Sequence, residues 1–495
     1  MTQTAINQEL AEFKNYIRDR RTAVLGIGIS NRPLIRFLHR LGADITAFDM
    51  LPADDPVLAK TRQDFEEEGI HLNWSVGEGY LERLEGFEIV FRTPRMRCDG
   101  PELQAELARG AIITSEMEVF LALCPAPVIG VTGSDGKTTT TTLIAEILEA
   151  AGCKVRLGGN IGTPLLDRIE EVRADDKVVV ELSSFQLLSM RQSCETALIT
   201  NISPNHLDFH TDYREYIDAK KNIFVNQSFL GRLILNARNS FSEEFVMEAR
   251  GQVVWTNDNP DTPHVGLAWG GRTWLDADGI LMAQGFKPGV DDHGVELVKR
   301  EEILIPGRFN VENLLAAAAA TLHIDAVNPD TVAHVARTFE GVPHRLEFIR
   351  ELDGVRWYNS GIDTGPSRTI ATLSALADSD AHGVLIMGGQ DKNSDYSGLG
   401  ESVLAVSRKI ILLGQNADLL RAEIQRASEV AGVFVSIVDV EDYETAVALA
   451  EELAMPGEVV VLTPAGTSYD RFRHFEERGN LYRELVRGLK NDRPL

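Results

Sequence analysis

Short apolar runs alternate with amphipathic stretches along most of the chain. In the first segment, an apolar run from Thr22 enters a glycine turn at 26–28, a helical pattern covers 33–42, and a second apolar run ends at Asp49. Short apolar runs are typical of buried parallel strands, and apolar positions recurring every three to four residues are typical of helices packed on them. The pattern predicts a β-α-β unit with a carboxylate at the end of its second strand.

Later parts of the chain repeat this alternation. Apolar runs begin at Val128, Val178 and Leu233, and further runs alternate with helical stretches toward the C-terminus. Strands that alternate with helices form mostly parallel sheets covered on both faces, so the pattern predicts an α/β fold. At about 150 residues for each domain, the 495 residues correspond to three domains, which we place at residues 1–123, 124–341 and 342–495.

A glycine-rich turn between an apolar run and an amphipathic helix is the strongest signal in the sequence. Gly133 and Gly136 let successive backbone N–H groups face a phosphate, Lys137 adds a positive charge, and the Thr138 hydroxyl is suited to Mg²⁺. The standard pattern asks for glycine where this chain has Val131, so the loop is a variant. A chance Lys-Thr pair after a structural turn is the alternative. The predicted nucleotide-binding residues are Gly133, Ser134, Asp135, Gly136, Lys137, Thr138 and Thr139.

Charge and composition exclude several functions. The formal net charge of −25 argues against a protein of nucleic acids or of anionic membrane surfaces. The four cysteines lie far apart, which predicts neither a zinc site nor a disulfide framework. No apolar run reaches the roughly 18 residues of a membrane span, so we expect a cytoplasmic protein without membrane insertion.

Two further stretches carry candidate chemistry. Glu181 ends an apolar run, where its carboxylate is placed to reach a magnesium ion at the loop; a solvated acid at a strand end is the alternative. His206 follows a proline turn and is predicted to face the site, whereas His210 is predicted to be a surface histidine. Lys220 and Lys221 are predicted to lie on the next helix, with a solvated surface charge as the alternative for each.

Nine motifs occur in a fixed order along the chain. They are GVTGSDGKTTT, GGNIGTP, ELSSFQL, NISPNHLD, DAKKNIF, PGRFNVENLLAA, GVPHRLE, GGQDK and TPAGTSYDRFRHFEERGN. Together they resemble the Mur ligases of peptidoglycan synthesis, over nearly the whole chain. ELSSFQL and the last motif are similar to the branch of the family that adds D-glutamate.

The resemblance implies a fold and a reaction. The fold has an N-terminal Rossmann-like domain for the UDP moiety, a central P-loop ATPase-type parallel sheet and a C-terminal Rossmann-like sheet for the amino acid. In the reaction, ATP with Mg²⁺ phosphorylates the carboxylate of UDP-N-acetylmuramoyl-L-alanine. The amine of D-glutamate then attacks the acyl phosphate, giving an amide, ADP and phosphate. We expect a monomer.

The resemblance also implies roles for individual residues. Catalytic roles fall to Lys137, His206 and Lys220, and Lys220 matches a lysine that is carbamylated in the family. The implied Mg²⁺ ligands are Thr138, Glu181, His206 and Lys220, and further ATP contacts come from Asn310 and Arg345. The implied substrate contacts are Asp49, Asn160 and Ser183 for UDP-muramoyl-alanine, and Thr364, Lys392, Ser468 and Phe475 for D-glutamate.

The chain departs from the family pattern in two segments. Where many members have an acid for the ATP ribose and a lysine for D-glutamate, this chain has Ser360 and Ile362. We expect Asp363 to replace that acid from a shifted position. In the first domain, Arg95 replaces a glycine that is common after Thr-Pro.

Three alternatives remain open from the sequence. The first is another ligase of the superfamily with a different amino acid or acceptor. The second is a nucleotide-binding protein without turnover, given the altered segment 359–365. The third is an NAD-dependent oxidoreductase that uses the first domain, which leaves the phosphate loop unexplained.

Overall fold

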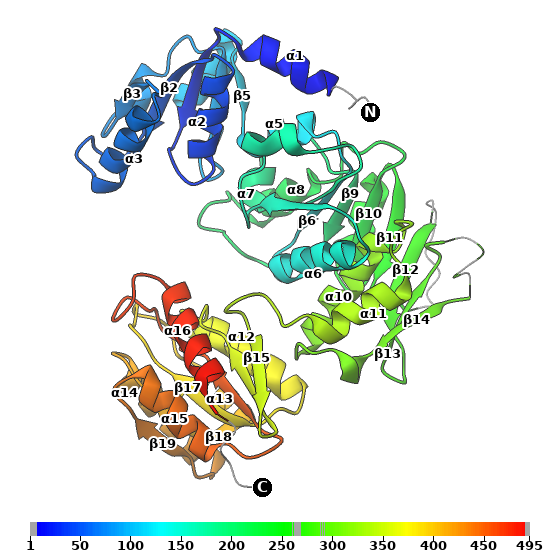
Figure 1. Cartoon of the computed structure of the whole chain (residues 1–495), viewed down its shortest axis with the longest axis vertical. Helices are drawn as coiled ribbons and strands as arrows, with labels where there is room; N and C mark the ends of the chain where they lie inside the picture. Colours follow the sequence, from blue (N-terminus) through cyan, green and yellow to red (C-terminus); the bar gives the residue numbers. More distant parts are fainter. Residues whose placement is uncertain are drawn as a thin grey trace. The chain divides into compact units, whose positions relative to one another are not determined.

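A computed structural model describes residues 7–259, 261, 269–287, 289, 291 and 293–490 (Figure 1). Their strands form three sheets, of five, nine and six strands. Two compact units are present. The first holds the five-stranded sheet and nearly all of the nine-stranded sheet, and the second holds the six-stranded sheet with the segments Asp276–Leu281 and Leu297–Leu314. The predicted α/β class is confirmed, whereas the three domain boundaries stay predictions.

The five-stranded sheet has the strand order β3-β2-β1-β4-β5, with every pair parallel. The predicted β-α-β unit is β1, α2 and β2, and Asp49 is the last residue of β2. The strands are β1 (Arg21–Leu25), β2 (Asp44–Asp49), β3 (Asn73–Val76), β4 (Ile89–Arg92) and β5 (Ile112–Thr114). The helices are α1 (Gln8–Ile17), α2 (Asn31–Arg40), α3 (Pro56–Glu67), η1 (Tyr80–Arg83), α4 (Pro101–Arg109) and α5 (Glu116–Leu123).

The nine-stranded sheet has the order β14-β13-β12-β11-β10-β9-β6-β8-β7, and the strands from β12 to β7 pair in parallel. Its strands are β6 (Val128–Thr132), β7 (Val155–Gly159), β8 (Lys177–Glu181), β9 (Thr196–Ile199), β10 (Arg232–Asn236), β11 (Gln252–Thr256), β12 (Trp269–Leu275), β13 (Ile280–Gln284) and β14 (Val295–Lys299). The accompanying helices are α6 (Lys137–Ala150), η2 (Leu166–Glu171), α7 (Ser184–Leu187), α8 (Tyr213–Lys221), α9 (Ser242–Glu248), η3 (Arg300–Glu302), α10 (Arg308–Thr321) and α11 (Pro329–Thr338).

The six-stranded sheet has the order β15-β16-β20-β17-β18-β19, in which only the β15–β16 pair is antiparallel. The strands are β15 (Glu347–Leu352), β16 (Val355–Asn359), β17 (Gly383–Met387), β18 (Ser407–Leu412), β19 (Ser436–Asp439) and β20 (Val459–Leu462). The helices are α12 (Pro366–Asp378), α13 (Leu399–Val406), α14 (Ala417–Ala431), α15 (Tyr443–Leu453) and α16 (Phe475–Gly488). This is the mostly parallel sheet that the alternating pattern predicted.

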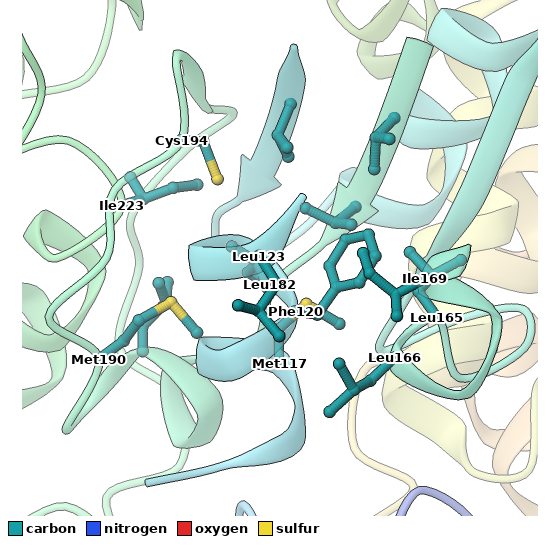
Figure 2. Packing of buried hydrophobic residues seen from close by; sticks show 14 of the residues in the cluster. Met117, Phe120, Leu123, Leu165, Leu166, Ile169, Leu182, Met190, Cys194 and Ile223 are labelled. Carbon is teal, nitrogen blue, oxygen red and sulfur yellow. The ribbon is translucent and has the colours of Figure 1, made fainter. Parts of the chain in front are cut away.

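One hydrophobic cluster includes side chains from both sheets of the first unit. Met117 and Phe120 of α5 pack in it with Leu166 and Ile169 of η2, and all four side chains are at most 2% exposed (Figure 2). The same cluster includes Phe37 of α2 and core residues of the nine-stranded sheet. Burying apolar surface is the main favourable contribution to folding, so this continuous core fixes the first sheet against the second.

The helices in the described part of the chain are all too short or too polar to cross a bilayer. The parallel strands instead gather polar turns at their C-terminal ends, where ligands bind in sheets of this kind.

Candidate active site

The predicted phosphate loop is a strand, a turn and a helix. β6 ends at Thr132, the turn spans Gly133 to Gly136, and α6 begins at Lys137. Gly133 has φ 149°, and a Cβ there would lie 1.9 Å from Oγ1 of Thr200. Only glycine therefore allows the loop to approach the neighbouring strand end this closely.

A side chain from the segment after β9 holds the loop in shape. Oδ1 of Asn201 accepts hydrogen bonds from the backbone N–H groups of Ser134, at 3.1 Å, and Asp135, at 2.8 Å. The Ser134 hydroxyl lies 2.8 Å from the hydroxyl of Tyr216 on α8. Because the first N–H groups of a helix have no partner within the helix, the start of α6, where Thr138 and the buried Thr139 lie, is an anion-binding site.

Two lysines meet at one backbone carbonyl of the loop. Nζ of Lys137 donates to the carbonyl oxygens of Gly133 and Ser134, each at 3.0 Å. Nζ of Lys220 donates to the same oxygen of Gly133 at 2.7 Å. Burial, and then the charge of Lys137, hold the pKa of Lys220 well below its ordinary value, so the neutral amine is favoured.

Neither Lys220 nor Lys221 is a solvated surface charge, so that alternative is wrong. Lys220 is 1% exposed and Lys221 is 6% exposed. Lys221 forms ion pairs with Glu244 and Glu248 on α9, which account for its position. Lys220 forms no ion pair with a described residue, and its Nζ lies 4.6 Å from the centre of the Tyr216 ring.

Glu181 lies beside the phosphate loop. Residue 181 pairs with Val131 across β8 and β6. The side chain is 1% exposed, so the alternative of a solvated strand-end acid is wrong. Its Oε1 accepts a hydrogen bond from Nδ2 of Asn160 at 2.8 Å, and its buried Oε2 has no hydrogen-bond partner among the described residues. A buried carboxylate oxygen without a donor is costly, and this one fits a cation.

Ser183 caps α7 rather than standing free. Its hydroxyl accepts a hydrogen bond from the backbone N–H of Gln186 at 3.3 Å, and its own N–H donates to Oε1 of Gln186 at 2.9 Å, which together form a capping box. The structure thus places Ser183 two residues beyond Glu181, with its hydroxyl already engaged within the helix start.

His206 stands in a left-handed backbone conformation, with φ 55°. Its ring centre lies 4.8 Å from that of Phe185 on α7. Burial lowers the pKa of His206, Asp208 opposes this, and the charges of Lys137, Lys220 and Arg95 lower it further. A neutral imidazole is the form that binds metal ions.

His210 is not on the surface, so that prediction is wrong. It is 3% exposed, and its Nε2 lies 3.0 Å from the Ser184 hydroxyl. The segment 206–210 forms a turn, in which the His210 N–H bonds to the His206 carbonyl, rather than an exposed helix. The rings of Phe185 and Tyr216 cover the His210 ring.

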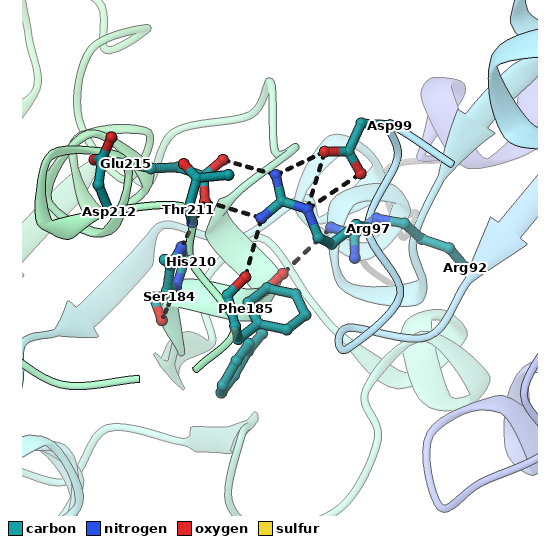
Figure 3. A network of polar contacts seen from close by, with 10 residues as sticks. Arg92, Arg97, Asp99, Ser184, Phe185, His210, Thr211, Asp212 and Glu215 are labelled. Atoms are coloured by element: carbon teal, nitrogen blue, oxygen red, sulfur yellow. Dashed lines mark hydrogen bonds and ion pairs between the residues drawn. The ribbon is translucent and has the colours of Figure 1, made fainter. Parts of the chain in front are cut away.

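A polar network that the sequence analysis did not identify surrounds His210 (Figure 3). Nδ1 of His210 lies 3.3 Å from Oε2 of Glu215 on α8. Arg97, from the segment after β4, donates to both carboxylate oxygens of Glu215 at 2.8 and 2.9 Å and also bonds to Asp99. The network ties the first sheet to the helix that bears Lys220. Of the polar side chains in this network, only Ser184 lies in one of the nine motifs, ELSSFQL.

A cavity of about 590 Å³ opens beside the glycine turn that follows β1. Asp49 lies in its lining, as predicted for a nucleotide pocket, and its carboxylate accepts hydrogen bonds from the N–H groups of Ile27, at 2.7 Å, and Leu51, at 3.0 Å. Asn31 occupies the place of a third glycine and donates to the Gly26 carbonyl at 2.8 Å. That contact explains how the turn forms without the third glycine.

In the second unit, three strand-end turns are brought together. Residues 390 and 467 pair through two backbone hydrogen bonds, which place Lys392 near the turn that holds Ser468. Nζ of Lys392 lies 5.4 Å from the ring centre of Tyr469. Arg478 is fully buried and donates to the carbonyls of Gly361 and Gly466, which links the turn before Thr364 to the same place. Phe475 begins α16.

The sequence analysis missed Arg478, although it lies in the last motif.

Asn310 is buried near the start of α10 and donates to the Pro306 carbonyl at 2.6 Å. Arg345 pairs with Val342 in an isolated antiparallel bridge. Asp363 is 3% exposed and accepts a hydrogen bond from Thr463 at 2.8 Å, and its role in place of the ribose-binding acid stays a prediction.

Comparison with known proteins identifies the family. The model of the Mur ligase middle domain matches residues 131–321, and that of the Mur ligase glutamate ligase domain matches residues 344–466. The chain belongs to the Mur ligase family, whose members are ATP-dependent ligases that form amide bonds. The resemblance found in the sequence is confirmed.

The similar relatives share one name. UDP-N-acetylmuramoylalanine--D-glutamate ligase of Acetivibrio thermocellus is 46% identical over 491 residues, which cover 98% of this chain and 100% of the relative. The enzymes of the same name from Ruminiclostridium cellulolyticum and Clostridium perfringens are 44% and 42% identical over the same shares.

Solved structures show the same fold at low identity. UDP-N-acetylmuramate-alanine ligase from Thermotoga maritima has a TM-score of 0.52 at 16% identity, covering 95% of this chain and 100% of that one. A UDP-N-acetylmuramoyl-L-alanyl-D-glutamate--2,6-diaminopimelate ligase has a TM-score of 0.54 at 16% identity, covering 90% and 93%.

The Arg97–Glu215 pair generates a pH prediction. The pair with Arg97 lowers the pKa of Glu215 to about 2, whereas an unfolded glutamate has a pKa of about 4.3. The stabilisation is therefore complete above about pH 4.3 and is lost as pH falls toward the folded pKa. We expect the difference in free energy of unfolding between wild type and Glu215→Gln to be constant from pH 7 to about 5.

Below about pH 4.3 this difference is expected to shrink, as measured by urea unfolding at each pH. In an Arg97→Ala background the same Glu215→Gln change should show little pH dependence. An equal pH dependence in both backgrounds would contradict the assignment of the pKa shift to Arg97.

Proposed function

We propose that this chain joins D-glutamate to UDP-N-acetylmuramoyl-L-alanine, with ATP, through an acyl phosphate. The observation that carries the proposal is the pairing of Lys137 and Lys220 at the Gly133 carbonyl, beside the unpartnered buried oxygen of Glu181. An enzyme that transfers a phosphoryl group to a carboxylate must neutralise several negative charges in one place. The names of the relatives, over the full length of the chain, support the choice of substrates.

The residues around the loop fit magnesium. Oxygen ligands suit this ion, and Thr138, Glu181, His206 and Lys220 are the proposed ligands. The buried Oε2 of Glu181 lacks a donor, and Glu181 contributes to the electrostatics of Lys220. No group of three His, Cys, Asp or Glu in the described part of the chain forms a metal cluster, and the proposed coordination includes hydroxyl and phosphate oxygens. When bound, Mg²⁺ supplies neutralisation of the phosphate oxygens and of the acceptor carboxylate.

The lowered pKa of Lys220 favours carbamylation. A neutral amine attacks CO₂ to form an N–C bond and then releases one proton, which leaves a carbamate anion. Burial beside Lys137 supplies that neutral amine. The carbamate carries two oxygens and a negative charge, which suits its proposed role as a ligand of Mg²⁺. Lys137 then remains as the ammonium group that stabilises the transferred phosphoryl group.

The strand-end turns of the second unit are proposed to hold D-glutamate. Lys392 would pair with a carboxylate, and Ser468 would donate to one, while Thr364 and Phe475 complete the surroundings. The deprotonated amine of the amino acid attacks the acyl carbon. The C–O bond to phosphate breaks, phosphate leaves with the electron pair, and the nitrogen gives up a proton to form the amide.

The proposal extends to the domain organisation, the oligomeric state and the cellular location of the protein. We infer three domains at 1–123, 124–341 and 342–495, a monomer, and a cytoplasmic location, where ATP and UDP-linked sugars are found. In the first unit, Asp49 and Asn160 are the proposed contacts to UDP-muramoyl-alanine, and Asn310 and Arg345 are proposed for ATP.

Phosphate release tests the choice of substrates. With ATP, Mg²⁺ and UDP-N-acetylmuramoyl-L-alanine, we expect D-glutamate to support steady release and L-glutamate to support little. Release with another amino acid in its place would favour a sister ligase. ATP binding without release under any of these conditions would favour a nucleotide-binding protein without turnover.

Replacing Lys137 tests the phosphate loop. Lys137→Ala should lower kcat by about 10³-fold, because removing one preorganised charge or donor from a transition state has effects of this size. Lys154→Ala, at a lysine whose side chain is 61% exposed, is the matched control and should leave kcat unchanged. Near wild-type turnover of Lys137→Ala would contradict the role of this residue.

Lys220 generates a separate prediction. Lys220→Ala should lose activity, and added acetate or formate should restore part of it by supplying the missing carboxylate-like ligand. Lys221→Ala, at the neighbouring ion-paired lysine, should show no such rescue. Loss of activity in Lys220→Ala that no small carboxylate restores would contradict the carbamate.

A further inference from the structure

Arg95 lies where the cavity of the first sheet approaches the central sheet. It follows β4, contributes to the lining of the 590 Å³ cavity together with Arg32, and is exposed. None of the motifs that carry the resemblance to the family includes this residue.

The Arg95 guanidinium also contacts the central sheet. Its central carbon lies 5.3 Å from the ring centre of Phe185, the ring that packs on His206 at 4.8 Å. The charge of Arg95 also contributes to the lowered pKa of His206, after burial and the two lysines. One side chain thus lies between the nucleotide-type cavity and the centre at which phosphoryl transfer is proposed.

Neither arginine of the cavity has an anionic partner among the described residues. Arg32 bonds through Nε to the Ile27 carbonyl at 3.2 Å, and Arg95 has only its contact with Phe185. The neighbouring Arg97, by contrast, is paired with Asp99 and Glu215. Asp49 is the carboxylate in the lining, and its oxygens accept hydrogen bonds from the N–H groups of Ile27 and Leu51 rather than from either arginine. In a chain with a net charge of −25, two guanidinium groups without an ion pair in one cavity indicate an anionic ligand.

We propose that Arg95, together with Arg32, binds the diphosphate of the UDP-linked substrate. The inference rests on the proposed function, since it takes the ligand to be a nucleoside diphosphate sugar. A guanidinium group binds phosphate oxygens through two parallel N–H donors. Gly28, at the end of the glycine turn, and Arg32, at the start of α2, line the same cavity, and the start of this helix adds partial positive charge. The stacking on Phe185 then aligns the bound diphosphate with the route toward His206.

Titration calorimetry of the full chain with uridine, UMP and UDP tests this assignment. In Arg95→Ala we expect the affinity for UDP to fall about tenfold or more, since bonds between charged groups contribute about 1.5–3 kcal/mol. The affinity for uridine should stay unchanged. Raising the salt concentration should weaken UDP binding in wild type more than in the variant.

A matched control is available in the same domain. Arg62 stacks on Trp74 at 4.9 Å, outside the residues that line the cavity, so Arg62→Ala removes a stacked arginine without removing the proposed phosphate contact. It should bind UDP as wild type does. In steady-state assays, Arg95→Ala should raise KM for the UDP-linked substrate and leave KM for ATP unchanged.

The outcomes separate the two proposals. Wild type that fails to bind UDP would overturn the proposed substrate. Wild type that binds UDP, with Arg95→Ala binding it equally well, would overturn only the role of Arg95. A loss of uridine affinity as large as the loss for UDP would also overturn it, because the variant would then have disturbed the cavity itself.

Discussion

Two lysines converge on one backbone carbonyl of the phosphate loop, and the proposed chemistry depends on this concentration of positive charge. Lys137 and Lys220 share the carbonyl of Gly133, and Lys220 is buried without an ion pair to any described residue. Two ammonium groups this close are unfavourable in an interior of low dielectric constant. The arrangement is relieved when Lys220 is neutral or when an anion is bound. The proposed carbamylation of Lys220 and the proposed binding of a triphosphate would each relieve this repulsion.

The continuous core of the first unit packs the sheet that bears the cavity beside β1 against the sheet that bears the phosphate loop. Phe120 and Leu166 belong to the same hydrophobic cluster as side chains of both sheets. Arg97 and Glu215 add a charged link between the segment after β4 and α8. A substrate that reaches from the cavity to His206 therefore meets a surface that is already assembled, which lowers the entropy cost of binding it.

Local patterns in the sequence predicted what depends on neighbouring residues, and missed what depends on distant ones. Asp49 and Lys137 were placed correctly because strand, turn and helix follow one another within a few residues. The burial of His210 was predicted wrongly and that of Lys221 was left open, since burial at those positions depends on Ser184 and Glu244, which lie 26 and 23 residues away. No periodicity in the sequence reports such partners.

The burial of Arg478 has a consequence for how the amino-acid site can vary. One guanidinium group holds the carbonyls of Gly361 and Gly466, while its own Nε has no described partner. Both turns are thus held by one side chain that solvent does not reach. A substitution at Arg478 would shift both turns together, so selectivity at the proposed amino-acid site is expected to vary through the residues that the turns present and not through Arg478.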